Sequence, residues 1–528
     1  MKGVLSWSQA TWVCTCLIAG STLLSVISIH RVQSRQGDTP FLSANDRSRW
    51  ATIAALVEDG TFSIDRWQDY RDPQTKARSY QSIDRVRHVD GNGIAHDYSS
   101  KPPLLPIVQA GVYALVRMVM GYRLPEDPFG VGRSVLVVFN ALPWGVALVV
   151  LAQITRRVCN TPLGWVYVVA AGGFATLLLP MTVTLNNHLP AAIGALVGFA
   201  ILQSDPDGEL STARGWVAGL AAGWMAACEL PALSLLMLWG GWLAWFHRSA
   251  LGYGYLPGVL LLGLCSVAAN FAAHGTWRPA YSQRDHDPLY VSSQYDVPND
   301  LSTLNTQEIA TQLLQRSPFP GARVVEVRRS ERSEEQCSID EVTIDQAPWR
   351  LALRVSQSGL TQLRGWGDWY DYPGSYWTGR QQGVDRGEPS RLTYAWHALS
   401  GHHGVFSLTP LWLLLPWGCW LHWRRASGSR ATQALVATVA VASLVCVVFY
   451  LTRPQIDRNY GGVSCGFRWM FWFALLWIWL IAPAADRLFA SSNGRILAMA
   501  LLLASLPAAL LALANPWQHP WLYRWLYD

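Results

Sequence analysis

A series of long apolar runs constrains the fold of this chain more than any other feature of its sequence. Most runs hold about 17–22 residues, a length that crosses the hydrocarbon core of a bilayer as one helix. Only 14% of the 528 residues are charged, whereas ordinary soluble domains have about 25%. The runs therefore predict an all-α polytopic membrane protein.

We predict eleven transmembrane helices in this chain. The first apolar run is longer than the core of a signal peptide and lacks a cleavage site, so we expect it to remain as an anchor. The eleven predicted helices cover residues 11–29, 132–151, 163–179, 189–203, 215–228, 232–246, 255–273, 404–421, 432–450, 469–485 and 496–514.

One further apolar segment, residues 106–121, is short and contains Pro106, Gln109 and Arg117. A helix lying at the membrane surface is expected there rather than a span. The short basic connectors then fall on the same side as Lys2, and two long polar stretches fall together on the other side. Because positive charge gathers in short cytoplasmic loops, we predict a cell inner-membrane protein with a cytoplasmic N-terminus and large periplasmic loops.

The two polar stretches divide the chain into three predicted parts. Residues 1–273 form an N-terminal membrane module that includes a first outer loop at 31–131. Residues 274–403 form an outer lobe, and residues 404–528 carry the last transmembrane helices.

The outer lobe is expected to be a small α+β unit. Residues 301–314 read as a helix that begins at Ser302 or Thr303. Rough alternation of apolar and polar residues, typical of half-buried strands, occurs at 323–328, 337–344 and 350–357.

Cysteine usage and charge narrow the possible ligands. Most of the nine cysteines lie inside apolar runs, and nothing has metal-ligand spacing, so no metal site is predicted. The formal net charge of +6 is modest, and no basic stretch is interleaved with aromatic residues. Nucleic acid is therefore not an expected partner, and the loop arginines suit anionic lipid headgroups instead.

The first outer loop opens with an amphipathic helix in which Trp50, Ile53 and Ala54 recur at helical spacing. Asp46 lies at its start. A carboxylate in that place can cap the helix. Alternatively, it can act as a general base that activates an acceptor hydroxyl at the bilayer surface. The spacing leaves both interpretations open.

The same loop ends with Lys101-Pro102-Pro103-Leu104. Proline is common in the first turn of a helix, so a second helix is predicted to begin here. Lys101 can extend toward lipid headgroups, or it can act as a point charge on a lipid phosphate.

Together, residues 46–60 and the Lys101-Pro102-Pro103-Leu104 motif resemble the first outer loop of the GT-C superfamily of membrane glycosyltransferases. The likeness is to the bacterial aminoarabinose transferase and protein O-mannosyltransferase branch, in which Asp-Glu-x-x-Tyr is followed by Lys-Pro-Pro-Leu. The resemblance implies that Asp46 is the catalytic base and that Lys101 binds the phosphate of a lipid carrier. Arg49 occupies a common basic position and Trp50 the aromatic one.

Two positions depart from this pattern. Arg47 replaces the glutamate of the family pair, and Ser100 replaces the acidic residue before Lys-Pro-Pro. The loss of two acids bears on metal dependence. We therefore predict no certain cofactor and leave a divalent metal open.

Two further clusters are predicted on the same side. Asn187, His188 and Glu229 lie at junctions between spans, where they can cap helices or line a sugar or acceptor pocket. Near the end of the chain, Arg453 and Arg468 can touch lipid headgroups or bind the donor phosphate.

Within the second cluster, Arg468 resembles an arginine that meets the donor phosphate in related transferases, and guanidinium binds phosphate bidentately. We assign Arg453, Arg468 and Lys101 to the phosphate. Tyr460 and Arg49 join the sugar or acceptor pocket.

The sequence thus predicts inverting transfer of a sugar from a polyprenyl-phosphate donor to an acceptor on the outer face of the membrane. Inversion follows from the family resemblance. The acceptor can be a glycolipid, a polysaccharide or a protein. The alternatives are a non-catalytic GT-C relative, or a transporter or scaffold for lipids or polysaccharides.

Overall fold

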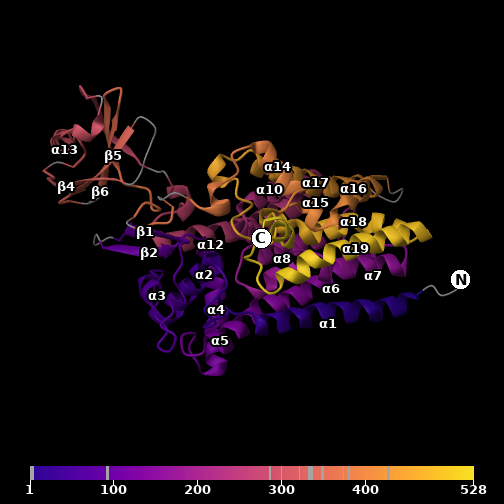
Figure 1. The fold of residues 1–528 in the computed structure, drawn as a ribbon. Coiled ribbons are helices and arrows are strands. Elements are labelled where there is room, and N and C mark those ends of the chain that lie inside the picture. The colour runs from indigo at the N-terminus through magenta and orange to yellow at the C-terminus, as the bar shows by residue number, and fades with distance from the viewer. Residues whose placement is uncertain are drawn as a thin grey trace.

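The computed structural model describes most of the chain. The described residues are 5–90, 94–284, 287–298, 300–319, 321–330, 337–346, 350–372, 374–377, 381–424 and 429–527. Within these ranges the chain is mainly helical (Figure 1), with one large helical bundle and a small lobe that contains a sheet.

Six helices among the described residues are long and apolar enough, by length and composition, to cross a membrane. The protein is therefore a multi-pass membrane protein. The six are Trp7–Arg31 (α1), Pro128–Arg156 (α5 to α6), Arg248–His274 (α11 to α12), Arg430–Leu451 (α17), Arg468–Leu488 (η11 to α18) and Ser492–Ala512 (α19).

The remaining predicted spans coincide with shorter helices. These are Pro162–Phe174 (α7), His188–Leu202 (α8), Thr212–Cys228 (α9) and Leu233–Phe246 (α10). The segment predicted at 404–421 is not one helix, and it divides into Val405–Leu408 (α15), Pro410–Leu414 (η9) and Leu415–Arg424 (α16). The break falls at Thr409, whose φ of −135° and ψ of 74° are not helical, because a following proline disfavours helical geometry in the residue before it. The total of eleven spans stays a prediction.

Five of the bundle helices begin in the same way, with a serine or threonine whose side chain accepts a hydrogen bond from a backbone N–H three residues later. Such caps satisfy an N–H that has no partner within the helix. Each of these helices begins after the N-terminal segment or after a short connector, and all five beginnings lie at the N-terminal end of the bundle. The capping residues are Ser6, Thr161, Ser211, Ser429 and Ser491.

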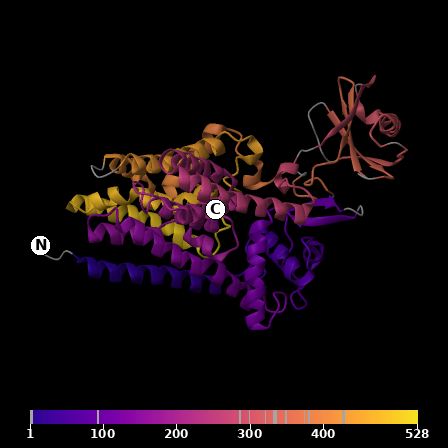
Figure 2. The same cartoon turned by 180° about the vertical axis from the view of Figure 1, so that it is seen from behind.

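The first outer loop folds over the opposite end of the bundle (Figure 1). It contains Ala44–Ala54 (α2), Asp65–Asp69 (α3), the hairpin Arg85–Val89 (β1) and Ala95–Ser99 (β2), and Leu104–Met120 (α4). Both views show α4 running across the end of the bundle rather than along it (Figures 1 and 2). This course suits the predicted helix at the membrane surface.

The amphipathic character of α4 explains its position. Leu105 and Tyr113 are buried against the protein, whereas Leu115, Met118 and Val119 are 60–81% exposed. An exposed apolar face on a helix that lies across the bundle end can enter the boundary between headgroups and acyl chains.

The outer lobe lies at the same end as the first loop, away from the N-terminus (Figure 1). It holds an antiparallel sheet in the order β3-β7-β6-β5-β4. The strands are Leu289–Gln294 (β3), Val324–Arg329 (β4), Cys337–Ile344 (β5), Arg350–Ser356 (β6) and Leu360–Gly365 (β7). The three predicted strands correspond to β4, β5 and β6.

The helix predicted at 301–314 is shorter than expected. It becomes a 3₁₀ turn at Leu301–Thr303 followed by Thr306–Gln315 (α13). Asn305, rather than Ser302 or Thr303, caps α13 by accepting a hydrogen bond from the backbone N–H of Glu308.

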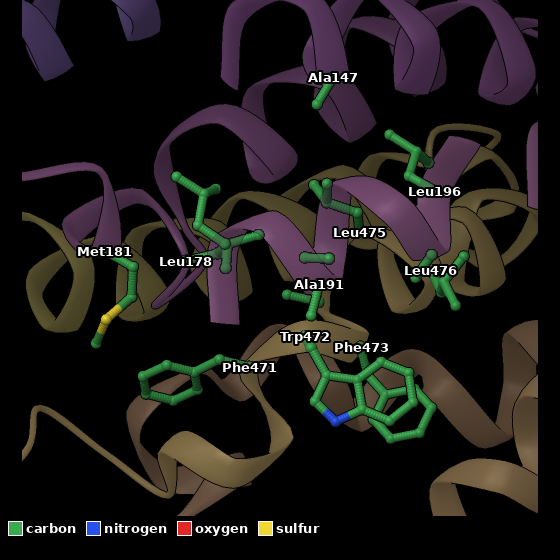
Figure 3. Packing of buried hydrophobic residues seen from close by; sticks show 14 of the residues in the cluster. Ala147, Leu178, Met181, Ala191, Leu196, Phe471, Trp472, Phe473, Leu475 and Leu476 are labelled. Atoms are coloured by element: carbon green, nitrogen blue, oxygen red, sulfur yellow. The ribbon is translucent and has the colours of Figure 1, made fainter. Parts of the chain in front are cut away.

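Packing in the bundle core brings α8 against η11 (Arg468–Phe473). Figure 3 shows Phe471, Trp472 and Phe473 gathered below Ala191 of α8, and all four residues are buried. Because η11 starts at Arg468 and α8 starts at His188, this packing holds the first residues of two distant segments near each other.

Candidate functional site

A cavity of about 670 Å³ lies where the first outer loop meets the bundle. Its walls come from the start of α4, the junction before α8, the end of α9, and α10, α12, α17 and η11. The volume falls within the range of about 300–1,000 Å³ that holds small ligands in proteins.

The lining of the cavity has a polar part and an apolar part. The charged and amide side chains are Asn45, Arg49, Lys101, Asn187, His188, Glu229, Asn270, Arg453, Asp457 and Arg468. The apolar part includes Leu104, Leu105, Ala226, Ala227, Leu230, Leu233, Leu236, Val259 and Phe449. An elongated ligand with a charged head and an apolar tail would match this division.

Arg49 extends from α2, which Ser43 caps, and only 2% of its surface is exposed. One terminal nitrogen donates to the carbonyl of Asn45 at 3.2 Å, and the other donates to Oδ1 of Asn187 at 2.9 Å. Its Nε has no hydrogen-bond partner in the described part of the chain. Burial lowers the pKa of Arg49 to about 10, even though the charge of Asp84 acts in the opposite direction.

Lys101 is held beside Asp84 by the β1–β2 hairpin. The hairpin register pairs Arg85 with Ser99, so Asp84 lies opposite Ser100, whose N–H donates to its carbonyl, and close to the next residue, Lys101. Lys101 Nζ is 3.2 Å from Asp84 Oδ1. Burial lowers the pKa of Lys101, and the neighbouring Asp84 opposes that shift.

Asp84 was not identified from the sequence. It follows Ser82 and Ile83 in a stretch without a distinctive motif, and its importance depends on the strand pairing. In the structure its charge acts on Lys101, Arg49 and Arg468.

Arg468 is the first residue of η11 and lines the cavity. Its guanidinium carbon lies 5.0 Å from the ring centre of Trp517, and its buried Nε has no hydrogen-bond partner among the described residues. The backbone of Gly461 passes beside this side chain with a φ of +94°, and an added Cβ there would lie 2.5 Å from Nε of Arg468. Only glycine fits this approach without strain.

Neither Arg49 nor Arg468 forms an ion pair within the described residues, and both contribute to the cavity lining. Lys101 and Asp84 form an ion pair beside them. The described part of the site therefore holds more positive charge than its carboxylates neutralise, which favours an anionic ligand.

Arg453 lines the same cavity but forms an ion pair with Asp457. A terminal nitrogen of Arg453 lies 2.5 Å from Oδ2 of Asp457. Its side chain is 40% exposed, so it is the most accessible of the predicted phosphate ligands.

Tyr460 lies outside the cavity lining, contrary to its predicted place in the pocket. Its hydroxyl donates to Glu388 Oε1 at 2.8 Å, and its ring stacks on His403 at 4.3 Å. These contacts hold the side chain in the buried core, where it is 1% exposed.

Asn187, His188 and Glu229 meet at the cavity, as their predicted role in a pocket requires. Asn187 Nδ2 donates to Glu229 Oε1 at 2.7 Å, and His188 Nδ1 is in close contact with the same oxygen. Asn187 also accepts from Arg49 at 2.9 Å through its oxygen. The side-chain amide of Asn187 thus links the guanidinium of Arg49 to the carboxylate of Glu229.

Asp46 is fully buried and lies outside the cavity lining. Its Oδ2 accepts from the backbone N–H of Leu42 at 2.8 Å, and its Oδ1 accepts from that of Leu185 at 3.0 Å. Burial raises the pKa of Asp46 to about 6 against the effect of these hydrogen bonds. Asp46 therefore ties the start of α2 to the segment before α8, and its catalytic role stays a prediction.

The donor set of the cavity does not fit a divalent metal. Hard cations require several carboxylate or carbonyl oxygens, whereas the charged lining consists mainly of arginine and lysine, with Glu229 and Asp457 as its acids. No group of three or more His, Cys, Asp or Glu residues suited to a metal ion occurs in the described ranges.

Comparison with known proteins gives similarity only at the level of solved structures. No protein-family model matches this chain, and no curated protein matches its sequence. The crystal structure of an Archaeoglobus fulgidus oligosaccharyltransferase in the apo form aligns with 96% of this chain and 56% of its own, at 11% identity and a TM-score of 0.47.

A second solved structure is archaeal oligosaccharyltransferase AglB from Archaeoglobus fulgidus, in complex with an inhibitory peptide and a dolichol-phosphate. It aligns with 98% of this chain and 57% of its own, at 12% identity and a TM-score of 0.44. This chain thus spans a little over half the length of these two proteins. Overlap at this level assigns no activity.

Proposed function

We propose that this protein is a membrane glycosyltransferase that takes a sugar from a polyprenyl-phosphate donor and transfers it to an acceptor at the outer face of the membrane. The observation that carries the proposal is the pair Arg49 and Arg468. Both line the cavity, neither has an ion-pair partner in the described ranges, and each has a buried Nε without a hydrogen bond.

Removing a charge from water without an opposite charge beside it costs several kcal/mol after relaxation. A phosphate group in the cavity would offset this cost, because guanidinium groups bind its oxygens with charge-assisted hydrogen bonds. Lys101, which also lines the cavity, would add a third positive charge. The head of the ligand would then be anionic.

The apolar wall supports a lipid rather than a free nucleotide sugar. Leu230, Leu233 and Phe449 line the cavity and also expose 43–51% of their surface. They belong to η4 (Leu230–Ala232), α10 and α17, elements of the membrane bundle. A prenyl chain could therefore leave the cavity directly into the bilayer while its phosphate stays on the cations.

Glycosyl transfer follows from the chemistry of such a donor. An acceptor hydroxyl attacks C1 of the sugar, the bond between C1 and the phosphate oxygen breaks, and that electron pair remains on the polyprenyl phosphate. Arg49, Arg468 and Lys101 stabilise the charge that develops on the leaving oxygen, a preorganised arrangement that accounts for large parts of many rate enhancements. A single displacement inverts C1.

The resemblance of the first outer loop implies Asp46 as the proton acceptor in this step. To act in that way, its carboxylate would have to release the N–H of Leu42 or Leu185 and reach the cavity. The proposed site lies on the periplasmic side of the inner membrane. The acceptor class, whether glycolipid, polysaccharide or protein, is left open by the cavity.

A binding measurement tests the donor assignment. Purified full-length protein in detergent should bind a short-chain polyprenyl phosphate more tightly than the matching polyprenol. Lys101→Ala and Arg468→Ala should each weaken this binding by about ten- to a hundredfold, because a lost charge-assisted hydrogen bond costs about 1.5–3 kcal/mol.

The matched control is Arg157→Ala, which removes an exposed arginine from the opposite end of the bundle and should leave the affinity unchanged. Equal affinity for the phosphate and the alcohol, or unchanged affinity in both cavity variants, would contradict the proposal.

A further inference from the structure

His188 and Glu229 form a buried pair within the cavity. His188 is 1% exposed and Glu229 is 5% exposed, and both belong to the lining. His188 Nδ1 contacts Glu229 Oε1, which also accepts from Asn187 Nδ2 at 2.7 Å. The hydrogen bond from Asn187 therefore holds the Glu229 carboxylate in contact with the imidazole of His188.

The close contact between Nδ1 and the carboxylate favours one tautomer of a neutral His188, although no aligned hydrogen bond joins the two atoms among the described residues. An ionised carboxylate can only accept hydrogen bonds, so a proton on Nδ1 is favoured, and the lone pair is then on Nε2. That nitrogen is buried and has no hydrogen-bond partner among the described residues. A buried acceptor nitrogen without a partner is costly, and a substrate hydroxyl would satisfy it.

The fold holds both residues by their backbones. The Asn186 side chain donates to the carbonyls of Met181 and Thr184, and its oxygen accepts from the N–H of Leu189. These bonds fix the turn that presents His188. Glu229 follows directly after α9, which packs along α8.

The pair is also coupled to the proposed phosphate site. Asn187 contacts Glu229 through its nitrogen and Arg49 through its oxygen. One amide therefore joins the carboxylate and a guanidinium that lines the cavity. A sugar whose phosphate lies on Arg49 would have its reacting carbon within the same cavity as His188.

We propose that His188 is the catalytic base of the transfer and that Glu229 is its positioning residue; this inference rests on the proposed function. The acceptor oxygen forms a bond with C1 while its proton passes to Nε2 of His188. The bond from C1 to phosphate breaks, and the electron pair leaves with the polyprenyl phosphate. Glu229 stabilises the imidazolium, which afterwards returns the proton to solvent.

Geometry favours His188 over Asp46 for this step. Both carboxylate oxygens of Asp46 accept backbone N–H groups outside the cavity lining. Nε2 of His188, by contrast, has an unused lone pair. The two assignments predict different variants to be inactive.

The test uses full-length protein reconstituted with total membrane lipid extract, with release of free polyprenyl phosphate as the readout. His188→Ala should lower the release by about 10²–10⁴-fold and should recover in part when imidazole is added. Its affinity for a short-chain polyprenyl phosphate should stay within about twofold of wild type, which shows that the variant is folded.

Glu229→Gln keeps the shape of the positioning residue and removes its charge. In this variant the protonated ring of His188 loses the negative charge that stabilises it. The positive charges of Arg49 and Arg468 still disfavour protonation of His188. The acidic limb of the pH–rate profile should therefore move to lower pH, with a reduced maximal rate. A residue that only packs would not move this limb.

The outcomes separate the two proposals. If wild type binds polyprenyl phosphate and releases it from the extract, but His188→Ala is fully active and Asp46→Asn is inactive, the inference is overturned and the proposed function stands. A loss in His188→Ala that imidazole does not restore would also overturn it. If wild type neither binds nor releases polyprenyl phosphate, the proposed function fails and the inference fails with it.

Discussion

The carboxyl group of Asp46 should make the stability of this protein depend on pH in an unusual direction. Burial raises its pKa from 3.8 to about 6 in the folded protein. Between about pH 4 and pH 6 the folded state therefore keeps a proton that the unfolded state has released. By linkage, the free energy of unfolding falls as the pH rises through this window.

The size of the effect follows from the change in pKa. A shift from 3.8 to about 6 corresponds to about 3 kcal/mol, since each pKa unit is worth about 1.4 kcal/mol. Below about pH 4 the carboxyl group is protonated in both states, and well above pH 6 it is ionised in both. The slope should therefore be confined to the interval between the two values.

The measurement compares the midpoint of thermal unfolding of wild type and Asp46→Asn in detergent, from pH 4 to pH 8. Asparagine cannot ionise, so the difference between the two proteins isolates the carboxyl group. For 150–250 residues, 1 kcal/mol shifts the midpoint by about 2–4 °C, and a larger chain shifts less. Wild type should lose stability relative to the variant as the pH rises from 4 to 6.

A pH-independent difference would refute this reasoning. So would a gain of wild-type stability with rising pH near pH 4, because a pKa that the N–H groups of Leu42 and Leu185 lowered below 3.8 would give the opposite slope there. The same variant bears on catalysis. If Asp46 is the base, release of polyprenyl phosphate falls by about 10²–10⁴-fold at every pH, and if it is structural the release persists.

Two further predictions concern the donor site and the topology. Gly461→Ala should weaken binding of polyprenyl phosphate without touching the ligand, because the added Cβ would strain a backbone at φ +94° and displace Arg468. Gly241→Ala, where the added Cβ meets nothing within 4 Å, is the control, and equal binding in both would contradict the role given to Arg468. Reporters fused after Arg157 and Arg214 should signal cytoplasm, and one inserted after Gln315 should signal the periplasm. A cytoplasmic signal from the lobe would overturn the outward-facing site.

The membrane part of the fold could be predicted from sequence because a bilayer requires long apolar helices. Hydropathy alone does not reveal the break at Thr409 within the predicted span 404–421, because the break depends on the backbone preference before Pro410. In the lobe, alternation identified β5 and β6, whose buried residues alternate in part. It missed β3, in which no residue is buried.

The cationic part of the site was predictable to the extent that short motifs mark it. The chemistry of Lys101 and Arg468 indicates phosphate binding, and the structure brings both residues to one cavity with Arg49. Asp84 was missed because its contact with Lys101 arises from hairpin register. The contact of His188 with Glu229 depends on the packing of α8 along α9, which the order of residues does not reveal.

The most direct test of the central claim is an experimental structure of the full-length protein with a bound polyprenyl phosphate. We expect the phosphate to contact Arg49, Lys101 and Arg468, with the prenyl chain passing Leu233 and Phe449 into the bilayer. A phosphate bound elsewhere, with these three cations still facing an unfilled cavity, would contradict it.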